Sequence, residues 1–117
     1  PGWRVGLERG RGRYCALVGG DRWGIELTGA EWQEFVAACQ GIQGGLESVA
    51  DVLMPEESVT LEQSGERITV IAMGLLKELT LYLQVHGEGD RHGEGFWEGE
   101  AIGQLWQAVS ELTDLQD

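Results

Sequence analysis

Cysteine is scarce in this chain, and long apolar runs are absent. Two cysteines, Cys15 and Cys39, occur among 117 residues and show no CxxC spacing. They are too few for a disulfide scaffold or a cysteine-ligated zinc site. Each lies in an apolar segment, so we expect two buried free thiols and a cytoplasmic protein.

No apolar run approaches the ~20 residues that cross a membrane, and no basic-then-apolar leader opens the chain, so we expect neither a membrane span nor a signal peptide.

Positive charge is also in short supply. Lys77 is the one lysine, and 8 basic residues stand against 20 acidic ones, which gives a net charge of -12. Such a surface repels nucleic acid, phosphate and anionic membranes unless one face is locally basic. The length suits one domain, which we expect to span residues 1–117.

The one basic cluster is the run RGRGR, with Arg9, Arg11 and Arg13. One interpretation is a hairpin loop, in which glycines supply positive φ and arginines supply solvation. The other is a contact with an anion or a single-stranded nucleic acid, since arginine pairs bidentately with phosphate. Both interpretations stay open at this point.

The first half of the chain predicts strands and then a long helix. Apolar and polar residues alternate with period two over residues 3–28, with glycine-rich turns between the runs, which predicts a three-stranded antiparallel meander. Thr28 lies three residues before Glu31, the spacing of a capping box at a helix start. Apolar residues then recur in steps of three and four, and Pro55 forbids continuation, so the prediction is a helix over 29–54 that ends near Met54.

The second half repeats this order. Alternation predicts strands over residues 58–98, with a glycine-rich acidic loop at 87–95 and only a short strand at Phe96 and Trp97. A last helix is predicted over 100–113, followed by a polar tail. Strands then a helix, twice, predict an α+β protein in which antiparallel meanders carry the helices.

Four segments carry a family resemblance: GWRVGLERG at 2–10, YCALVGGDRWGIELTGAEW at 14–32, LMPEESVTLEQ at 53–63 and HGEGFWEG at 92–99. Together they resemble a small family of cyanobacteria and plastid-bearing lineages that carries no assigned function. The resemblance spans nearly the whole chain. It implies a fold similar to that of the Whirly and positive-cofactor type of single-stranded-DNA-binding transcriptional regulators, with a sheet-then-helix unit that is duplicated in Whirly proteins. No segment matches the lysine-containing strand motif of Whirly proteins, so no binding residue is carried over.

The candidates for chemistry are weak. His86, Glu88, Asp90 and His92 include two metal-ligating histidines, but their spacing fits no standard site, and we expect no metal and no cofactor. The carboxylates of the glycine-rich loop repel phosphate, and no GK[ST] follows. No Ser-His-Asp or Cys-His pattern is recognisable, so we expect no enzyme.

Five tryptophans in 117 residues point instead to packing and protein contact. Trp3 and Trp23 fall on apolar strand faces, where we expect core packing. Trp97, beside a glycine-rich loop, is the candidate for a partly exposed interface anchor. We therefore expect a non-enzymatic cytoplasmic protein-interaction or assembly module that self-associates. The alternative is a weak single-stranded nucleic-acid binder that uses Arg9, Arg11 and Arg13.

Overall fold

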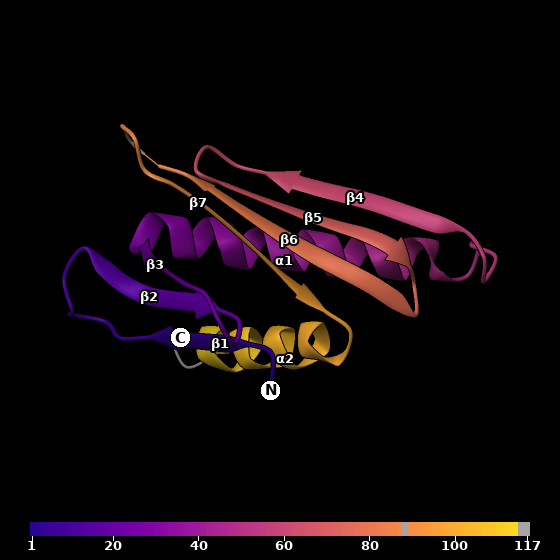
Figure 1. The fold of residues 1–117 in the computed structure, drawn as a ribbon, viewed down its shortest axis with the longest axis horizontal. Coiled ribbons are helices and arrows are strands. Elements are labelled where there is room, and N and C mark those ends of the chain that lie inside the picture. Colours follow the sequence, from indigo (N-terminus) through magenta and orange to yellow (C-terminus); the bar gives the residue numbers. More distant parts are fainter. Residues whose placement is uncertain (88, 115–117) are drawn as a thin grey trace.

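The computed structural model describes residues 1–87 and 89–114, and it confirms the α+β class. Two antiparallel sheets form, each followed by a helix (Figure 1). The first sheet, in the order β1-β2-β3, and its helix have these bounds: β1 Arg4–Leu7, β2 Tyr14–Gly19, β3 Gly24–Thr28 and α1 Gly29–Ala50. The second sheet, in the order β4-β5-β6-β7, and its helix have these: β4 Ser58–Ser64, β5 Ile68–Leu75, β6 Glu78–His86, β7 His92–Glu98 and α2 Glu100–Asp114. The strands therefore form two sheets, not one.

The predicted loop at 87–95 was too long. Strand β7 begins at His92 and pairs with β6 from His86↔His92 through Thr80↔Glu98. Gly93 and Gly95 lower the strand propensity of this segment, but they lie where other side chains press on the backbone. Ile25 and the Trp23 ring occupy the space that Cβ atoms at Gly93 and Gly95 would need. The glycines thus belong to a strand that is closely approached, not to a loop.

Helix α1 begins as predicted and ends earlier. The Glu31 amide donates to the Thr28 hydroxyl, and the Glu31 carboxylate accepts from the Thr28 amide, which confirms the capping box. The helix ends at Ala50 and not near Met54. Beyond Ala50 an extra turn would find no sheet to pack on, and Val52 and Met54 are exposed. Packing, rather than Pro55 alone, sets this end.

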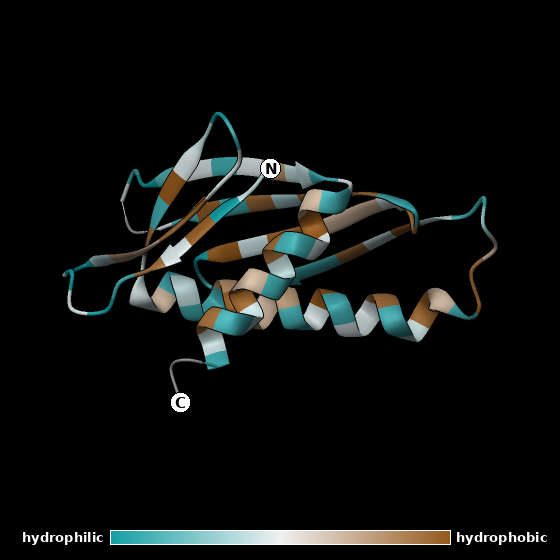
Figure 2. Ribbon diagram, turned by 90° about the horizontal axis from the view of Figure 1, so that it is seen from below, coloured by the Kyte–Doolittle hydropathy of each residue, from teal (hydrophilic) through white to brown (hydrophobic). Residues whose placement is uncertain are grey.

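The core lies between α1 and the two sheets. Helix α1 covers one face of β4–β7 and also contacts β2 and β3, while α2 packs against β1 and β7 (Figure 2). The α1 glycines permit a close approach to β4, because the Gln63 side chain fills the space beside Gly41 and Leu61 fills that beside Gly45. In the part of the chain that the structure describes, no helix is long and apolar enough to cross a membrane.

Candidate functional site

No helix of the described residues covers the face of β4–β7 that points away from α1; Figure 1 looks onto this face. We call it the outer face. Alternation along the strands sends one set of side chains inward to α1 and the other set outward. Register then aligns Ile71 of β5 with Tyr82 of β6, and Tyr82 with Phe96 of β7. The outer face thus presents apolar side chains in a row across three strands.

We call this row, together with the neighbouring Met73, the apolar stripe. Phe96 is 49% exposed, Met73 44% and Tyr82 39%, although all three are large and apolar or aromatic. The Tyr82 and Phe96 rings lie 6.2 Å apart between centroids. A shallow hollow of about 240 Å³ lies beside them, lined by Ile71, Met73, Tyr82, Leu83, Gln84, Glu94 and Gly95. Clustered apolar exposure on an open sheet is typical of an interaction surface.

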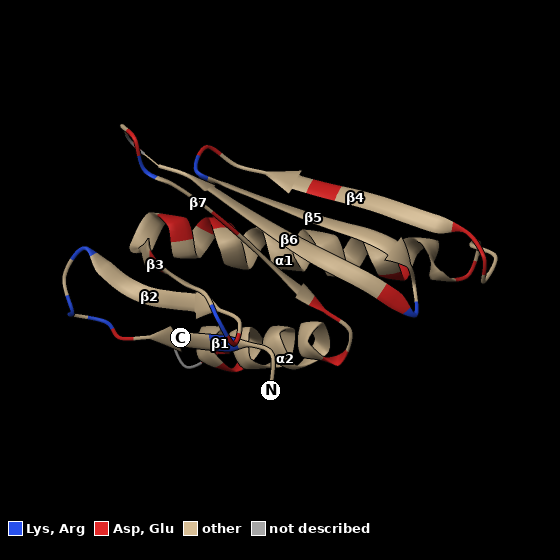
Figure 3. Cartoon of the chain, in the orientation of Figure 1, with Lys and Arg blue, Asp and Glu red and all other residues tan. Residues whose placement is uncertain are grey.

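The charge around the stripe has one sign. Glu62, Glu94 and Glu98 stand on the outer face, and Glu78 joins them at the start of β6 (Figure 3). Among the described residues, no strand position of this face holds Lys or Arg. Aromatic side chains on an open sheet suit base stacking only when positive charge accompanies them. This face has the aromatic side chains without that charge.

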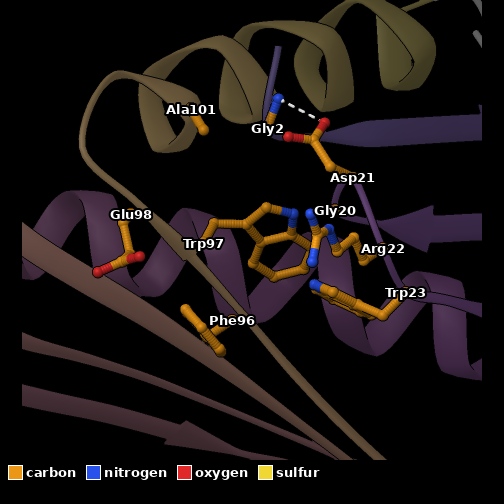
Figure 4. Close-up of a pocket in the computed structure, with 9 residues that line it drawn as sticks. All are labelled: Gly2, Gly20, Asp21, Arg22, Trp23, Phe96, Trp97, Glu98 and Ala101. Carbon is orange, nitrogen blue, oxygen red and sulfur yellow. Dashed lines mark hydrogen bonds between the residues drawn. The ribbon is translucent and has the colours of Figure 1, made fainter.

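A second hollow, of about 410 Å³, lies at the β7 edge, where the β2–β3 turn meets the start of α2 (Figure 4). We call it the edge pocket. Trp97 and Trp23 form its aromatic wall, with ring centroids 5.0 Å apart, and Arg22 and Glu98 stand at its rim. Phe96 borders both this pocket and the apolar stripe. The two features therefore adjoin along one side of β7.

Trp97 is not the partly exposed anchor that we expected. It is 1% exposed, and its ring centroid lies 6.0 Å from that of Phe35. Its indole N–H donates to the Gly19 carbonyl at 2.8 Å. Its neighbour Phe96 is the exposed aromatic residue. The two side chains point to opposite faces of β7, and the pairing of β7 with β6 determines which one points inward.

The apolar stripe was not predicted as a site, because most of it leaves no local signal in the sequence. The available signal was in β5, where Ile71 and Met73 are apolar although they fall on the opposite phase from Val70 and Ala72. A strand that is apolar on both phases indicates a second face that is covered or binds something. The contributions of Tyr82 and Phe96 depend on register between strands and leave no local signal.

The arginine loop, residues 9–13, joins β1 to β2, and Gly10 and Gly12 adopt positive φ there, at 82° and 112°. Arg9, Arg11 and Arg13 are all exposed. Arg11 Nη2 lies 3.8 Å from the Glu26 carboxylate, and the Arg13 guanidinium lies 5.8 Å from the centre of the Tyr14 ring. Among the described residues Arg9 forms no ion pair.

The other two N-terminal arginines lie at the opposite end of the first sheet. Arg4 donates to the carbonyls of Gly20 and Trp23, at 2.8 and 2.6 Å, so it holds the β2–β3 turn. Arg22 stands at the edge pocket. The five arginines therefore do not gather on one concave face (Figure 3).

Arg91, directly before β7, pairs with the buried carboxylate of Glu31. Its Nη2 lies 2.6 Å and its Nε 2.9 Å from the two oxygens of Glu31, and Nη2 also donates to the Glu26 carbonyl. Burial raises the pKa of Glu31, but the hydrogen bonds from Arg91 and the Thr28 amide outweigh it and hold that pKa below its ordinary value. The same hydrogen bonds with Glu31 raise the pKa of Arg91. A fully partnered carboxylate of this kind ties β7 to α1 and is not poised for proton transfer.

The histidines and cysteines do not converge on one site. His86 Nε2 lies 3.1 Å from the Thr69 hydroxyl, and His92 Nε2 lies 3.5 Å from Glu94. Within residues 1–87 and 89–114, no group of three or more His, Cys, Asp or Glu side chains is arranged to hold a metal ion. Glu88, part of the metal interpretation, lies outside the described residues.

The two thiols differ in burial. Cys39 is buried and free, and burial raises the pKa of its thiol to about 12. Cys15 is also free but only half-buried, not fully buried as expected, because it lies at the start of β2 where the ladder to β3 shifts register. Because of its high pKa, the Cys39 thiol stays protonated and unreactive near neutral pH.

Two comparisons with known proteins give matches. The sequence profile of a family described as "Domain of unknown function (DUF1818)" matches residues 1–112. A crystal structure from Prochlorococcus sp. NATL2A, described as a protein with unknown function from the DUF155 family, superposes with a TM-score of 0.89 at 27% identity, and the match covers 96% of this chain and 93% of that one. No curated protein sequence matches the chain.

Proposed function

The chain belongs to the DUF1818 family, a domain of unknown function, and from the geometry of its outer face we propose that it is a non-enzymatic protein-interaction module. The apolar stripe is the binding surface. One observation carries this proposal: Met73, Tyr82 and Phe96 are 39–49% exposed on a sheet face where, among the described residues, the charged strand positions other than histidine are carboxylates. Free thiols in a chain with no disulfide suit a reducing compartment, so the cytoplasm is the proposed location.

The proposed partner is an amphipathic segment with Lys or Arg beside apolar side chains. Carboxylates around an apolar centre select positive charge at the rim and apolar groups in the middle. Neighbouring strands lie ~4.8 Å apart and successive helix turns ~5.4 Å apart, so one apolar side chain per helix turn meets one strand of the stripe. A helix laid across β5, β6 and β7 is the partner that this spacing favours.

The test uses a synthetic helical peptide with a leucine face and a lysine face, titrated into ¹⁵N-labelled protein. We expect saturable amide shift changes centred on Ile71, Tyr82 and Phe96, and an affinity that falls between ~50 and ~200 mM salt as the Debye length shortens. The combined substitution of Tyr82→Ser and Phe96→Ser removes binding. Val52→Ser is the matched control, because Val52 is 75% exposed and lies outside the four-stranded sheet, after α1.

The control peptide replaces every lysine with glutamate and keeps the leucine face. It does not bind if the carboxylates select positive charge. Shift changes scattered over the protein, or equal affinity for the stripe variant and the Val52 control, contradict the proposal.

The second candidate is single-stranded nucleic-acid binding through the arginine loop. Arg9 and Arg13 support it, since both are exposed and neither forms an ion pair among the described residues. The twofold sheet-then-helix order, which resembles that of Whirly-type regulators, adds to this support. Fluorescence anisotropy with a labelled oligonucleotide tests it, with Arg9, Arg11 and Arg13 changed together to alanine. Binding that persists unchanged in the triple variant excludes the loop; loss of binding and of its salt dependence supports it.

A further inference from the structure

Strand β4 is an open edge of the four-stranded sheet. It pairs with β5 along all seven residues, from Ser58↔Leu75 to Ser64↔Thr69, without a register shift. No other described strand adjoins its far side, and in Figure 1 it forms the outer border of the sheet. At the opposite border, Trp23 and Ile25 of the first sheet pack on Gly95 and Gly93, on the face of β7 that points inward. An open edge presents a row of backbone donors and acceptors to any strand that fits.

This edge has few of the features that usually prevent strand addition. It contains no proline, no lysine and no bulge, and its one charged residue is Glu62. Val59 and Leu61 point toward the α1 side and stay half-exposed. A straight, weakly charged edge strand with half-exposed apolar residues is the type that pairs with a second chain.

The β4 sequence, SVTLEQS, is complementary to itself in one antiparallel register. With the twofold axis at Leu61, that residue faces Leu61 of the second copy, and Thr60 faces the second copy's Glu62 on both sides of the axis. Val59 then faces Gln63, and Ser58 faces Ser64. The two leucines form an apolar pair on the α1 side, and the threonine hydroxyls meet carboxylates on the outer face. No charge faces a like charge.

We propose that two copies of this chain associate through β4, antiparallel about a twofold axis at Leu61, to form one continuous eight-stranded sheet. The occupant is a second copy because the register satisfies both strands at once, which is the requirement of a twofold interface. This inference is independent of partner binding at the apolar stripe, although pairing would place two stripes on one continuous face. Since each chain carries a charge of -12, added salt strengthens the association.

Sedimentation equilibrium of the full chain tests the proposal, from about 5 µM to 500 µM at ~150 mM salt, where long-range repulsion is screened. The unmodified chain is expected to shift from 12.8 kDa to twice that mass as concentration rises. Thr60→Glu creates two Glu-Glu pairs across the axis and is expected to weaken association by about 2- to 30-fold. The double variant Thr60→Glu with Glu62→Lys turns the same pairs into Glu-Lys pairs and restores or tightens association.

The matched control is Ser110→Glu, which adds the same charge at an exposed position on α2. It leaves the dissociation constant within about twofold of the unmodified value, while circular dichroism checks that all variants fold. A 12.8 kDa species at every concentration overturns the proposal. So does a dimer that responds equally to Thr60→Glu and Ser110→Glu, or one that the double variant fails to restore.

Discussion

Replacing Arg91 with methionine tests how much the buried ion pair stabilises the fold. Glu31 is 2% exposed and receives two hydrogen bonds from Arg91, at 2.6 and 2.9 Å. Arg91→Met keeps much of the side-chain volume but leaves the carboxylate buried, with the Thr28 amide as its remaining hydrogen-bond donor among the described residues. Removing one partner of a buried pair costs about 3–5 kcal/mol, because the remaining charge stays desolvated.

The lower end of that range suits a site in which one hydrogen bond to Glu31 survives. A loss of about 3 kcal/mol corresponds to a fall in Tm of about 12 °C, taking ~2.1 cal/mol/K of unfolding entropy per residue over the chain. Urea unfolding followed by tryptophan fluorescence measures the loss of free energy at pH 7. Arg11→Met is the matched control: it removes the same charge, but from a half-exposed pair with Glu26 at 3.8 Å, and costs under about 1 kcal/mol.

The pH dependence of this effect has a definite sign. The folded-state pKa of Glu31 lies below its ordinary value, so the ion pair's stabilisation is fully present above pH 4.5 and is lost as pH falls through the folded-state pKa. Without Arg91, burial is the main effect on the Glu31 carboxyl and its pKa rises. Protonation of Glu31 then removes the cost of a buried charge in the variant. The stability gap between the two proteins is therefore expected to narrow from pH 7 to pH 4. The reasoning is refuted if Arg91→Met lowers the free energy of unfolding no more than Arg11→Met does. It is also refuted if the difference in unfolding free energy between the unmodified protein and Arg91→Met does not change with pH.

Two further predictions concern side-chain packing. Gly95→Ala places a Cβ against the Trp23 ring and is expected to lower the free energy of unfolding by about 1–3 kcal/mol. Gly103→Ala, which has open space in α2, is expected to raise the free energy of unfolding by about 0.5–1 kcal/mol. Urea unfolding measures both variants, and equal effects would contradict the prediction. In the folded protein at pH 7, Ellman's reagent is expected to titrate Cys15 and not Cys39, because burial raises the pKa of the Cys39 thiol to about 12. Two fast-reacting thiols per folded chain would contradict that picture.

Local patterns were sufficient to predict most of the fold. Period-two alternation predicted strands, and Thr28 and Glu31 marked the start of α1 because a capping box is made by residues three apart. The end of α1 was missed because it depends on where the sheet beneath it stops, which no window around Val52 reveals. Contacts between residues within one helix turn can be predicted from the local sequence, whereas contacts across the core cannot.

The candidate site shows the same division. The turn that carries Arg9, Arg11 and Arg13 between β1 and β2 was predictable because RGRGR is contiguous; its role in binding stays a prediction. The apolar stripe brings together residues from three strands, and Tyr82 meets Phe96 only in one register. A shift by one residue would have exposed Trp97, as we expected, and buried Phe96. Periodicity defines two faces of a strand; pairing decides which face meets the core.

The packing of Trp23 on Gly95 has a consequence for how the chain comes apart. That contact, with the Trp97 hydrogen bond to Gly19 and the Arg91 hydrogen bond to Glu26, joins the first sheet to the second. The two sheet-and-helix units look alike in outline, yet neither is complete alone. A chain cut in the connection at 51–57 would yield two fragments. Each would expose an apolar surface that the other fragment covers in the intact chain. Such fragments should regain native tryptophan fluorescence when mixed and remain unstructured when kept apart.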